Sequence, residues 1–159
     1  MTISDTRTQA DDKSGALLCR LVQESGHRVH EQCIVPDDIY QIRATVSRWI
    51  ADPGVQVILT TGGTGITGRD GTPEAVRPLL DKEIDGFGEM FRKLSFDLIG
   101  TSTIQSRALA GVANGTFIFN LPGSSGACKD GWTQLISQQL DYRTRPCNLV
   151  ELMPRLLET

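Results

Sequence analysis

The chain has 159 residues and a mass of 17.4 kDa, a size typical of one domain with a full hydrophobic core. Its net charge of −3 and the absence of basic clusters from the sequence argue against a nucleic-acid partner. No apolar run is long enough to cross a bilayer, and the first twelve residues lack a signal-peptide core, so we expect a cytoplasmic protein without membrane contact.

Hydrophobic periodicity predicts strands and helices in alternation along the chain. In chain order, the pattern predicts a helix that contains Leu17–Val22, a strand over 29–35, a helix over 37–50, a strand over 55–59, a helix from Thr72, a helix over 87–98, two strands over 108–113 and 116–121, and a last helix that contains Cys128 and Ile136. This alternation predicts an α/β fold with a mostly parallel sheet that is covered on both faces.

Caps and turns indicate where several of these elements begin and end. Asp12 or Ser14 is the expected N-cap of the first helix, and Thr72 is the expected N-cap of a helix with Pro73 at its first position. The Asn114-Gly115 dipeptide favours a type I′ turn. The strands on either side of it should therefore form an antiparallel hairpin, which we expect at an edge of the sheet.

A glycine-rich loop after the strand over 55–59 is the most distinctive motif. It reads Thr60-Thr61-Gly62-Gly63-Thr64-Gly65 and continues through Gly68-Arg69-Asp70-Gly71 into the helix at Thr72. Such a loop can bring backbone N–H groups close to an anion such as a nucleotide phosphate. It matches neither the P-loop nor the dinucleotide-binding pattern, and a tight turn without a ligand is the alternative.

Two carboxylates follow predicted strands. Asp37 comes after the strand over 29–35, and Asp70 comes after the glycine-rich loop. Because the carboxyl ends of parallel strands meet at one edge of a sheet, both acids could face one cleft and bind Mg²⁺, which prefers oxygen ligands. Each acid has an alternative role at a helix N-terminus, Asp37 as a cap and Asp70 as a favourable charge.

Two further loops are candidates for binding. Pro122-Gly123-Ser124-Ser125 opens the last helix, where N–H groups and hydroxyls could hold a phosphate, and a capped helix start is the alternative. The N-terminal stretch with Ser4 and Asp5 is the other candidate. Arg69 and Arg107 are either phosphate partners or solvated surface charges.

Motifs along nearly the whole chain resemble the molybdenum cofactor biosynthesis protein B family. These motifs are Ser4-Asp5-Thr6-Arg7-Thr8, Asp12-Lys13-Ser14-Gly15, Pro36-Asp37-Asp38, the glycine-rich loop through Gly71-Thr72-Pro73-Glu74-Ala75, Gly86-Phe87-Gly88-Glu89, Ser106-Arg107-Ala108, Leu121-Pro122-Gly123-Ser124 and the segment 141–148. The resemblance implies a three-layer α/β molybdopterin-binding fold that assembles as a trimer or as a hexamer.

The resemblance also implies a reaction. The terminal phosphate of molybdopterin attacks the α-phosphorus of ATP, which gives adenylyl-molybdopterin and pyrophosphate, with Mg²⁺ as cofactor. A protein that binds molybdopterin and passes it on without turning over ATP is the alternative. The implied site residues are the catalytic and Mg²⁺-binding acids Asp37 and Asp70, the nucleotide-binding residues Thr61, Gly62, Gly63, Thr64, Gly65, Ser4 and Asp5, and the pterin-binding residues Pro122, Gly123, Ser124 and Ser125.

The two ends of the chain carry separate expectations. The resemblance implies an apolar strand before Ser4, of which this sequence holds only Met1-Thr2-Ile3, so we expect a shortened first strand. We place the molybdopterin-binding domain at residues 1–145. Residues 146–159 should form a tail that packs on the domain or on a neighbouring subunit, and we favour the neighbour for the apolar residues Leu149, Val150, Leu152 and Met153.

Overall fold

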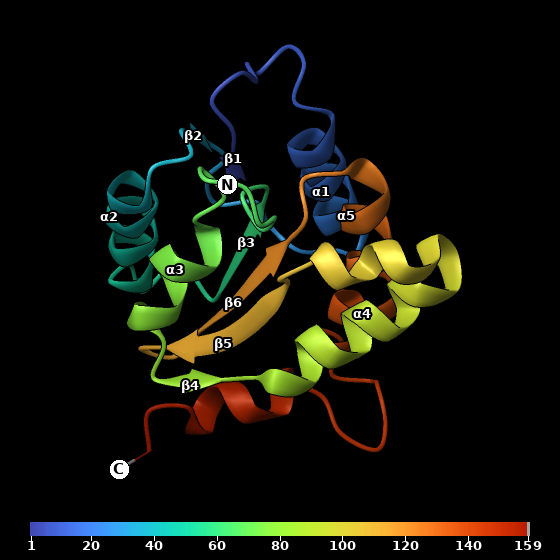
Figure 1. Ribbon diagram of the computed structural model, residues 1–159. Helices are drawn as coiled ribbons and strands as arrows, with labels where there is room; N and C mark the ends of the chain where they lie inside the picture. Colours follow the sequence, from blue (N-terminus) through green and yellow to red (C-terminus); the bar gives the residue numbers. More distant parts are fainter. Residues whose placement is uncertain (159) are drawn as a thin grey trace.

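The strands form one six-stranded sheet with the order β2-β1-β3-β6-β5-β4 (Figure 1). The first four in this order run parallel, and β5 and β4 extend the sheet antiparallel, so the predicted α/β class is confirmed. The structure is a computed structural model that describes residues 1–158. Its strands are β1 (Thr2–Ile3), β2 (Ile34–Val35), β3 (Val57–Thr61), β4 (Lys82–Glu83), β5 (Leu109–Ala113) and β6 (Thr116–Leu121).

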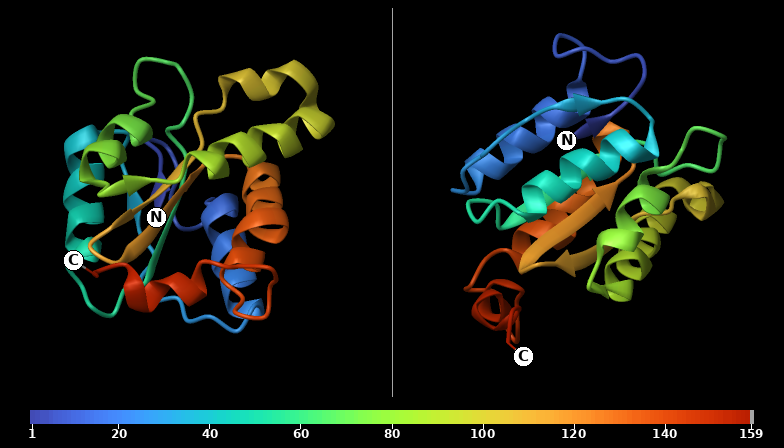
Figure 2. Two further views of the ribbon diagram at one scale, coloured as in Figure 1. Left: turned by 90° about the horizontal axis from the view of Figure 1, so that it is seen from below. Right: turned by 90° about the vertical axis from the view of Figure 1, so that its left-hand side faces the viewer.

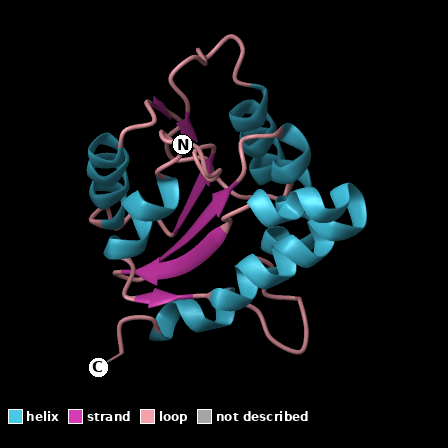
Figure 3. Ribbon diagram, viewed as in Figure 1, coloured by secondary structure: helices cyan, strands magenta, loops and turns pink. Residues whose placement is uncertain are grey.

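Helices cover both faces of this sheet. α2 and α3 lie on one face and α1, α4 and α5 on the other, which gives the expected three layers (Figures 2 and 3). The α-helices are α1 (Lys13–Glu24), α2 (Ile39–Ile50), α3 (Thr72–Val76), α4 (Asp85–Ile99), α5 (Ser125–Gly131) and α6 (Ser137–Gln139). The 3-10 helices are η1 (Arg77–Leu79), η2 (Gly100–Gln105) and η4 (Val150–Arg155), and η3 (Trp132–Ile136) is a π-helix.

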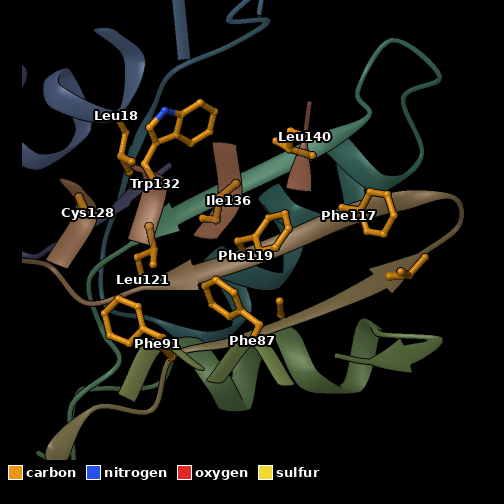
Figure 4. Close-up of a cluster of buried hydrophobic side chains, with 13 residues drawn as sticks. Leu18, Phe87, Phe91, Phe117, Phe119, Leu121, Cys128, Trp132, Ile136 and Leu140 are labelled. Carbon is orange, nitrogen blue, oxygen red and sulfur yellow. The ribbon is translucent and has the colours of Figure 1, made fainter. Parts of the chain in front are cut away.

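The central strand β6 joins two hydrophobic cores. Successive side chains of a strand point to opposite faces, so Phe117 and Phe119 enter the core under α1, α4 and α5, while Ile118 enters the core under α2 and α3. Figure 4 shows the first of these cores, with Trp132 and Phe91 around the two phenylalanines. Because β6 is buried on both faces, it is a rigid base for the loop that follows it.

The hairpin around Asn114-Gly115 is confirmed, and it belongs to the antiparallel edge of the sheet, with one further strand outside it. Both turn residues have positive φ, 47° and 78°, as a type I′ turn requires. β5 is not the outermost strand, because β4 pairs with its free side. β4 has two exposed polar residues, Lys82 and Glu83, and its sequence therefore carries no hydrophobic signal.

The N-caps are resolved by the structure. Asp12 caps α1, since its Oδ1 accepts a hydrogen bond of 2.9 Å from the N–H of Gly15. Thr72 does not cap α3 as predicted. Gly71 occupies the cap position, and the Thr72 hydroxyl instead donates to the carbonyl oxygen of Gly62 at 2.9 Å. α3 is therefore fastened to the glycine-rich loop.

The predicted strand over 29–35 is mostly wrong, because β2 covers only its last two residues. β1 is as short as expected and offers β2 only two partners. A cavity of about 480 Å³ lies between the segment 27–32 and β3, with Met1 at its wall. The amino group of Met1 donates to the carbonyl oxygen of Leu59 at 2.8 Å, and burial lowers the pKa of this amine.

The C-terminal segment lies against the body of the same chain. Leu149, Met153 and Leu156 pack against the core that contains Trp132, and the N–H of Leu149 donates to the carbonyl oxygen of Gln139 at 3.0 Å. Leu152 remains 45% exposed. None of the helices within residues 1–158 combines the length and the apolar character that a membrane crossing needs.

Candidate functional site

The glycine-rich loop after β3 and the loop after β6 lie side by side at the carboxyl end of the sheet (Figure 1). Three contacts fasten them. The Thr61 hydroxyl donates to the carbonyl oxygen of Pro122 at 3.0 Å, and the N–H of Gly62 donates to that of Leu121 at 3.0 Å. The third is a close backbone approach, because a Cβ at Gly123 would lie only 3.3 Å from the Cα of Gly62. Two of the predicted binding loops therefore form one continuous surface.

Backbone conformation explains the two adjacent glycines in the first of these loops. Gly62 has a φ of 106° and Gly63 a φ of 63°, values that residues with a side chain rarely adopt. A Cβ at Gly62 would also lie 2.2 Å from the carbonyl oxygen of Ile3. The N–H groups of Gly63 and Thr64 donate no hydrogen bond within residues 1–158, so an anion could use them.

The two predicted acids flank the glycine-rich loop. A Cβ on Gly63 would lie 2.9 Å from Oδ1 of Asp37, and a Cβ on Gly65 would lie 2.7 Å from Oδ2 of Asp70. Both carboxylates therefore reach the backbone of the same loop, two residues apart, although 33 positions separate them in the sequence. The expectation that strand ends bring Asp37 and Asp70 together agrees with this geometry.

The two acids differ in their electrostatic environments. Burial, followed by the charges of Asp5 and Asp70, raises the pKa of the Asp37 carboxyl above its usual range. The hydroxyl of Thr67 has the opposite effect on Asp70, because its hydrogen bond, together with the backbone N–H groups of Thr67 and Gly65, lowers the pKa of that carboxyl. Asp70 is thus held as an anion, whereas for Asp37 the positive charge of Arg69 only partly offsets burial and the neighbouring carboxylates.

Asp5 joins this group from the loop after β1. Its carboxylate pairs with Arg69, with 2.6 Å between Oδ2 and Nε, and it accepts a hydrogen bond of 3.1 Å from the N–H of Asp37. The predicted residue Ser4 lies beside it, and its Oγ accepts from the N–H groups of Thr6 and Arg7. In this structure Arg69 is therefore an ion-pair partner that links the loops after β1 and β3.

Arg107 has a role that the sequence did not indicate. Its guanidinium donates to the carbonyl oxygen of Gly65 at 2.8 Å and to that of Asp70 at 2.9 Å, and it pairs with Glu74. It therefore holds both ends of the segment that carries Asp70. The one available signal was its motif, Ser106-Arg107-Ala108, which has no chemistry of its own.

The loop after β6 combines a helix start with an open side. Ser124 is the N-cap of α5, and its Oγ accepts a hydrogen bond of 3.1 Å from the N–H of Ala127. The carbonyl oxygen of Gly123 accepts one of 3.0 Å from Arg7. Pro122 and Ser125 complete this loop and are half-buried. Its hydroxyls lie on the same edge of the sheet as the glycine-rich loop.

The site supplies oxygen donors but no complete metal cage of protein side chains. Within the described residues, no group of three or more His, Cys, Asp or Glu side chains is arranged to hold a metal ion. In many proteins Mg²⁺ is bound by one or two carboxylates and completes its coordination shell with water and substrate phosphates. The two acids at the glycine-rich loop suit a site of this kind.

Comparisons with known proteins agree with these motifs and with this fold. A family model described as "Probable molybdopterin binding domain" matches residues 1–142. Molybdenum cofactor biosynthesis protein B of Escherichia coli strain K12 is 57% identical over 148 residues, which are 93% of this chain and 87% of that protein. Among solved structures, a molybdenum cofactor biosynthesis protein B is 50% identical, with a TM-score of 0.85 over 87% of each chain. The tungsten cofactor synthesizing protein of Pyrococcus furiosus is 39% identical, with a TM-score of 0.78 over 87% of this chain and 89% of that chain.

Proposed function

The chain belongs to the molybdenum cofactor biosynthesis protein B family, and from this premise we propose that it transfers the adenylyl group of ATP to molybdopterin. In the proposed reaction, a terminal phosphate oxygen of molybdopterin forms a bond to the α-phosphorus of ATP. The bond from that phosphorus to the β-bridging oxygen breaks, and pyrophosphate leaves. The product is adenylyl-molybdopterin.

One observation carries this proposal: the glycine-rich loop lies between two carboxylates and beside a second open loop. Adenylyl transfer brings two anions together, so it depends on orienting them and on neutralising their charge. In the proposal, the N–H groups of Gly63 and Thr64 hold a nucleotide phosphate, and the loop over 122–125 holds the pterin substrate. The contact between the two loops would keep the two phosphates adjacent.

Asp37 and Asp70 are the residues that would hold Mg²⁺. The raised pKa of Asp37 fits this role, because a cation would offset the burial and the neighbouring negative charges that oppose its ionisation. When bound, Mg²⁺ would neutralise charge that develops on the phosphate oxygens. Arg107 would fix Asp70 in place through the carbonyl oxygens on either side of the loop.

The decisive experiment mixes the purified protein with ATP, Mg²⁺ and molybdopterin and measures adenylyl-molybdopterin and pyrophosphate in equal amounts. Asp70→Asn keeps an oxygen acceptor for Thr67 but removes the charge, so we expect product formation to fall at least about 100-fold with the fold intact. Asp97→Asn, an exposed acid on α4, is the matched control and should retain full activity. Binding of molybdopterin without product in the unaltered protein would favour the carrier function instead.

We also propose that the protein self-associates as a trimer or as a dimer of trimers. The exposed side chains of Phe96, Leu98, Ile99 and Ile104 gather on the end of α4 and on η2, where they are 55–77% exposed. Neighbouring exposed apolar side chains of this kind are typical of contacts between subunits.

A further inference from the structure

Arg7 links three segments that the proposed site needs in register. It lies in the loop after β1, and its side chain is 34% exposed. One guanidinium nitrogen donates to the hydroxyl of Ser14 in the first turn of α1. The other donates to the carbonyl oxygen of Gly123 at 3.0 Å, 116 positions along the chain. Arg7 is therefore a physical connection between the N-terminal loop, α1 and the loop over 122–125.

A buried carboxylate holds Arg7 in this position. The Asp12 side chain is 1% exposed, and its Oδ1 lies 3.6 Å from Nη1 of Arg7. Its two oxygens also accept hydrogen bonds from the Thr2 hydroxyl at 2.6 Å and from the N–H of Gly15 at 2.9 Å. The guanidinium supplies a positive charge beside this buried carboxylate, so moving it away from Asp12 costs free energy even though the hydrogen bonds to Asp12 remain. Asp12 thereby fixes the Arg7 guanidinium, which in turn donates to the carbonyl oxygen of Gly123.

We propose that Arg7 is the positioning residue of the pterin half of the site, an inference that rests on the proposed function. The loop over 122–125 is held at Pro122 by Thr61 and at Gly123 by Arg7. Gly123 has no side chain of its own that could fix it, so the bond from Arg7 sets the position of its carbonyl group. Loss of that bond frees the side of the loop that faces the N-terminal segment.

The side chain of Arg7 should affect the binding of the two proposed substrates differently. The backbone N–H of Arg7 donates a hydrogen bond of 3.2 Å to Oγ of Ser4, a residue on the proposed nucleotide side. Substitution of the Arg7 side chain leaves this hydrogen bond in place. Within residues 1–158, the Arg7 guanidinium makes polar contacts only with Gly123 of the loop over 122–125, with Ser14 and with Asp12. A change of side chain should therefore weaken molybdopterin binding and leave ATP binding almost unchanged.

The test measures binding of molybdopterin and of ATP separately by titration calorimetry, together with the KM for each substrate and the Tm. In Arg7→Gln we expect the Kd and KM for molybdopterin to rise about tenfold, with less than a twofold change for ATP. Arg7→Lys keeps a positive charge beside Asp12 but cannot donate in a planar fork to Ser14 and Gly123 together. Arg7→Lys should therefore have a Tm close to that of the unaltered protein but the weakened molybdopterin affinity of Arg7→Gln.

Arg48→Gln is the matched control. Arg48 lies on α2, away from both loops, and its guanidinium donates two hydrogen bonds of 2.8 Å to Glu31. This variant should leave both affinities unchanged. Unchanged molybdopterin affinity in Arg7→Gln, or equal losses for both substrates in both Arg7 variants, would overturn the inference. If the unaltered protein binds molybdopterin but forms no product, the proposed function fails while the binding test of Arg7 still stands.

Discussion

The two acids at the glycine-rich loop should respond to pH with opposite signs. The pKa of Asp37 is raised, so the native state binds this proton more tightly than the unfolded chain does, and stability falls as the carboxyl ionises above about pH 4. The pKa of Asp70 is lowered, so its ionised form stabilises the native state, and this contribution is lost as pH falls through the lowered pKa.

We therefore expect Asp37→Asn to raise the Tm at pH 7 by about 1–3 °C and Asp70→Asn to lower it by a similar amount. Below pH 3 the effect of Asp37→Asn should vanish, because both the native and the unfolded carboxyl are then protonated. Thermal melts at pH 3 and pH 7 test this pair. Shifts of the same sign in the two variants at pH 7 would contradict the assigned environments.

A methyl group at Gly63 should damage both the fold and the site. It would lie 2.4 Å from Oγ1 of Thr72 and 2.9 Å from Oδ1 of Asp37, at a positive φ that disfavours alanine. We expect Gly63→Ala to lower the free energy of unfolding by about 1–3 kcal/mol and to abolish ATP binding.

Gly68→Ala is the matched control within the same segment. A Cβ at Gly68 meets no heavy atom within 4 Å, so its unfolding free energy should change by less than about 1 kcal/mol. Denaturant unfolding of the two variants separates them. Equal losses would show that the segment as a whole, and not the crowding at Gly63, governs stability.

At the scale of single residues, the sequence indicated the acids and the loops but not how they are fastened. Asp37 and Asp70 could be paired in advance because both follow strands of one parallel sheet. The hydrogen bonds of Arg7 and Arg107 could not be predicted, because each joins a side chain to a backbone carbonyl oxygen more than 30 positions away. A carbonyl group leaves no signature in the sequence, so such contacts appear only in the folded chain.

At the scale of elements, the C-terminal segment should stabilise the fold through one face of η4. Met153 packs against the core and Leu152, its neighbour, is 45% exposed. We expect Met153→Ala to lower the free energy of unfolding by about 1–2 kcal/mol and Leu152→Ala to change it by less than about 0.5 kcal/mol. Chemical denaturation measures both. If Leu152→Ala instead lowers the mass of the assembly in light scattering, that side chain lies between subunits.

Elements with strong periodicity or caps were predictable, and elements that depend on distant partners were not. α2 and α4 followed from their apolar spacing, and the β5–β6 hairpin followed from Asn114-Gly115. The segment 29–33 alternates like a strand, but pairing needs a neighbour and β1 spans only Thr2–Ile3. β4 is the reverse case, since it is a strand only because β5 offers it a free edge.

At the scale of the whole molecule, the apolar surface on α4 and η2 should govern the proposed self-association. Replacing Leu98 and Ile104 together with Glu places two charges on this surface, so we expect the molecular mass in light scattering to fall to that of one chain. Tyr40→Glu, at a side chain that is 70% exposed on α2, is the control and should leave the mass unchanged. An unchanged mass in the double variant would place the subunit contact elsewhere.

The contact between Gly62 and Gly123 has a consequence for how the two substrates bind. The loops on which they would bind share three contacts, none of which involves the side chain of Arg7, so a ligand that orders one loop would also order the other. The two proposed binding equilibria would then be linked, and linkage is reciprocal. The factor by which bound nucleotide would change the affinity for the pterin equals the factor by which bound pterin would change the affinity for nucleotide. Cooperativity between the substrates would thus arise within a single chain, without a second subunit.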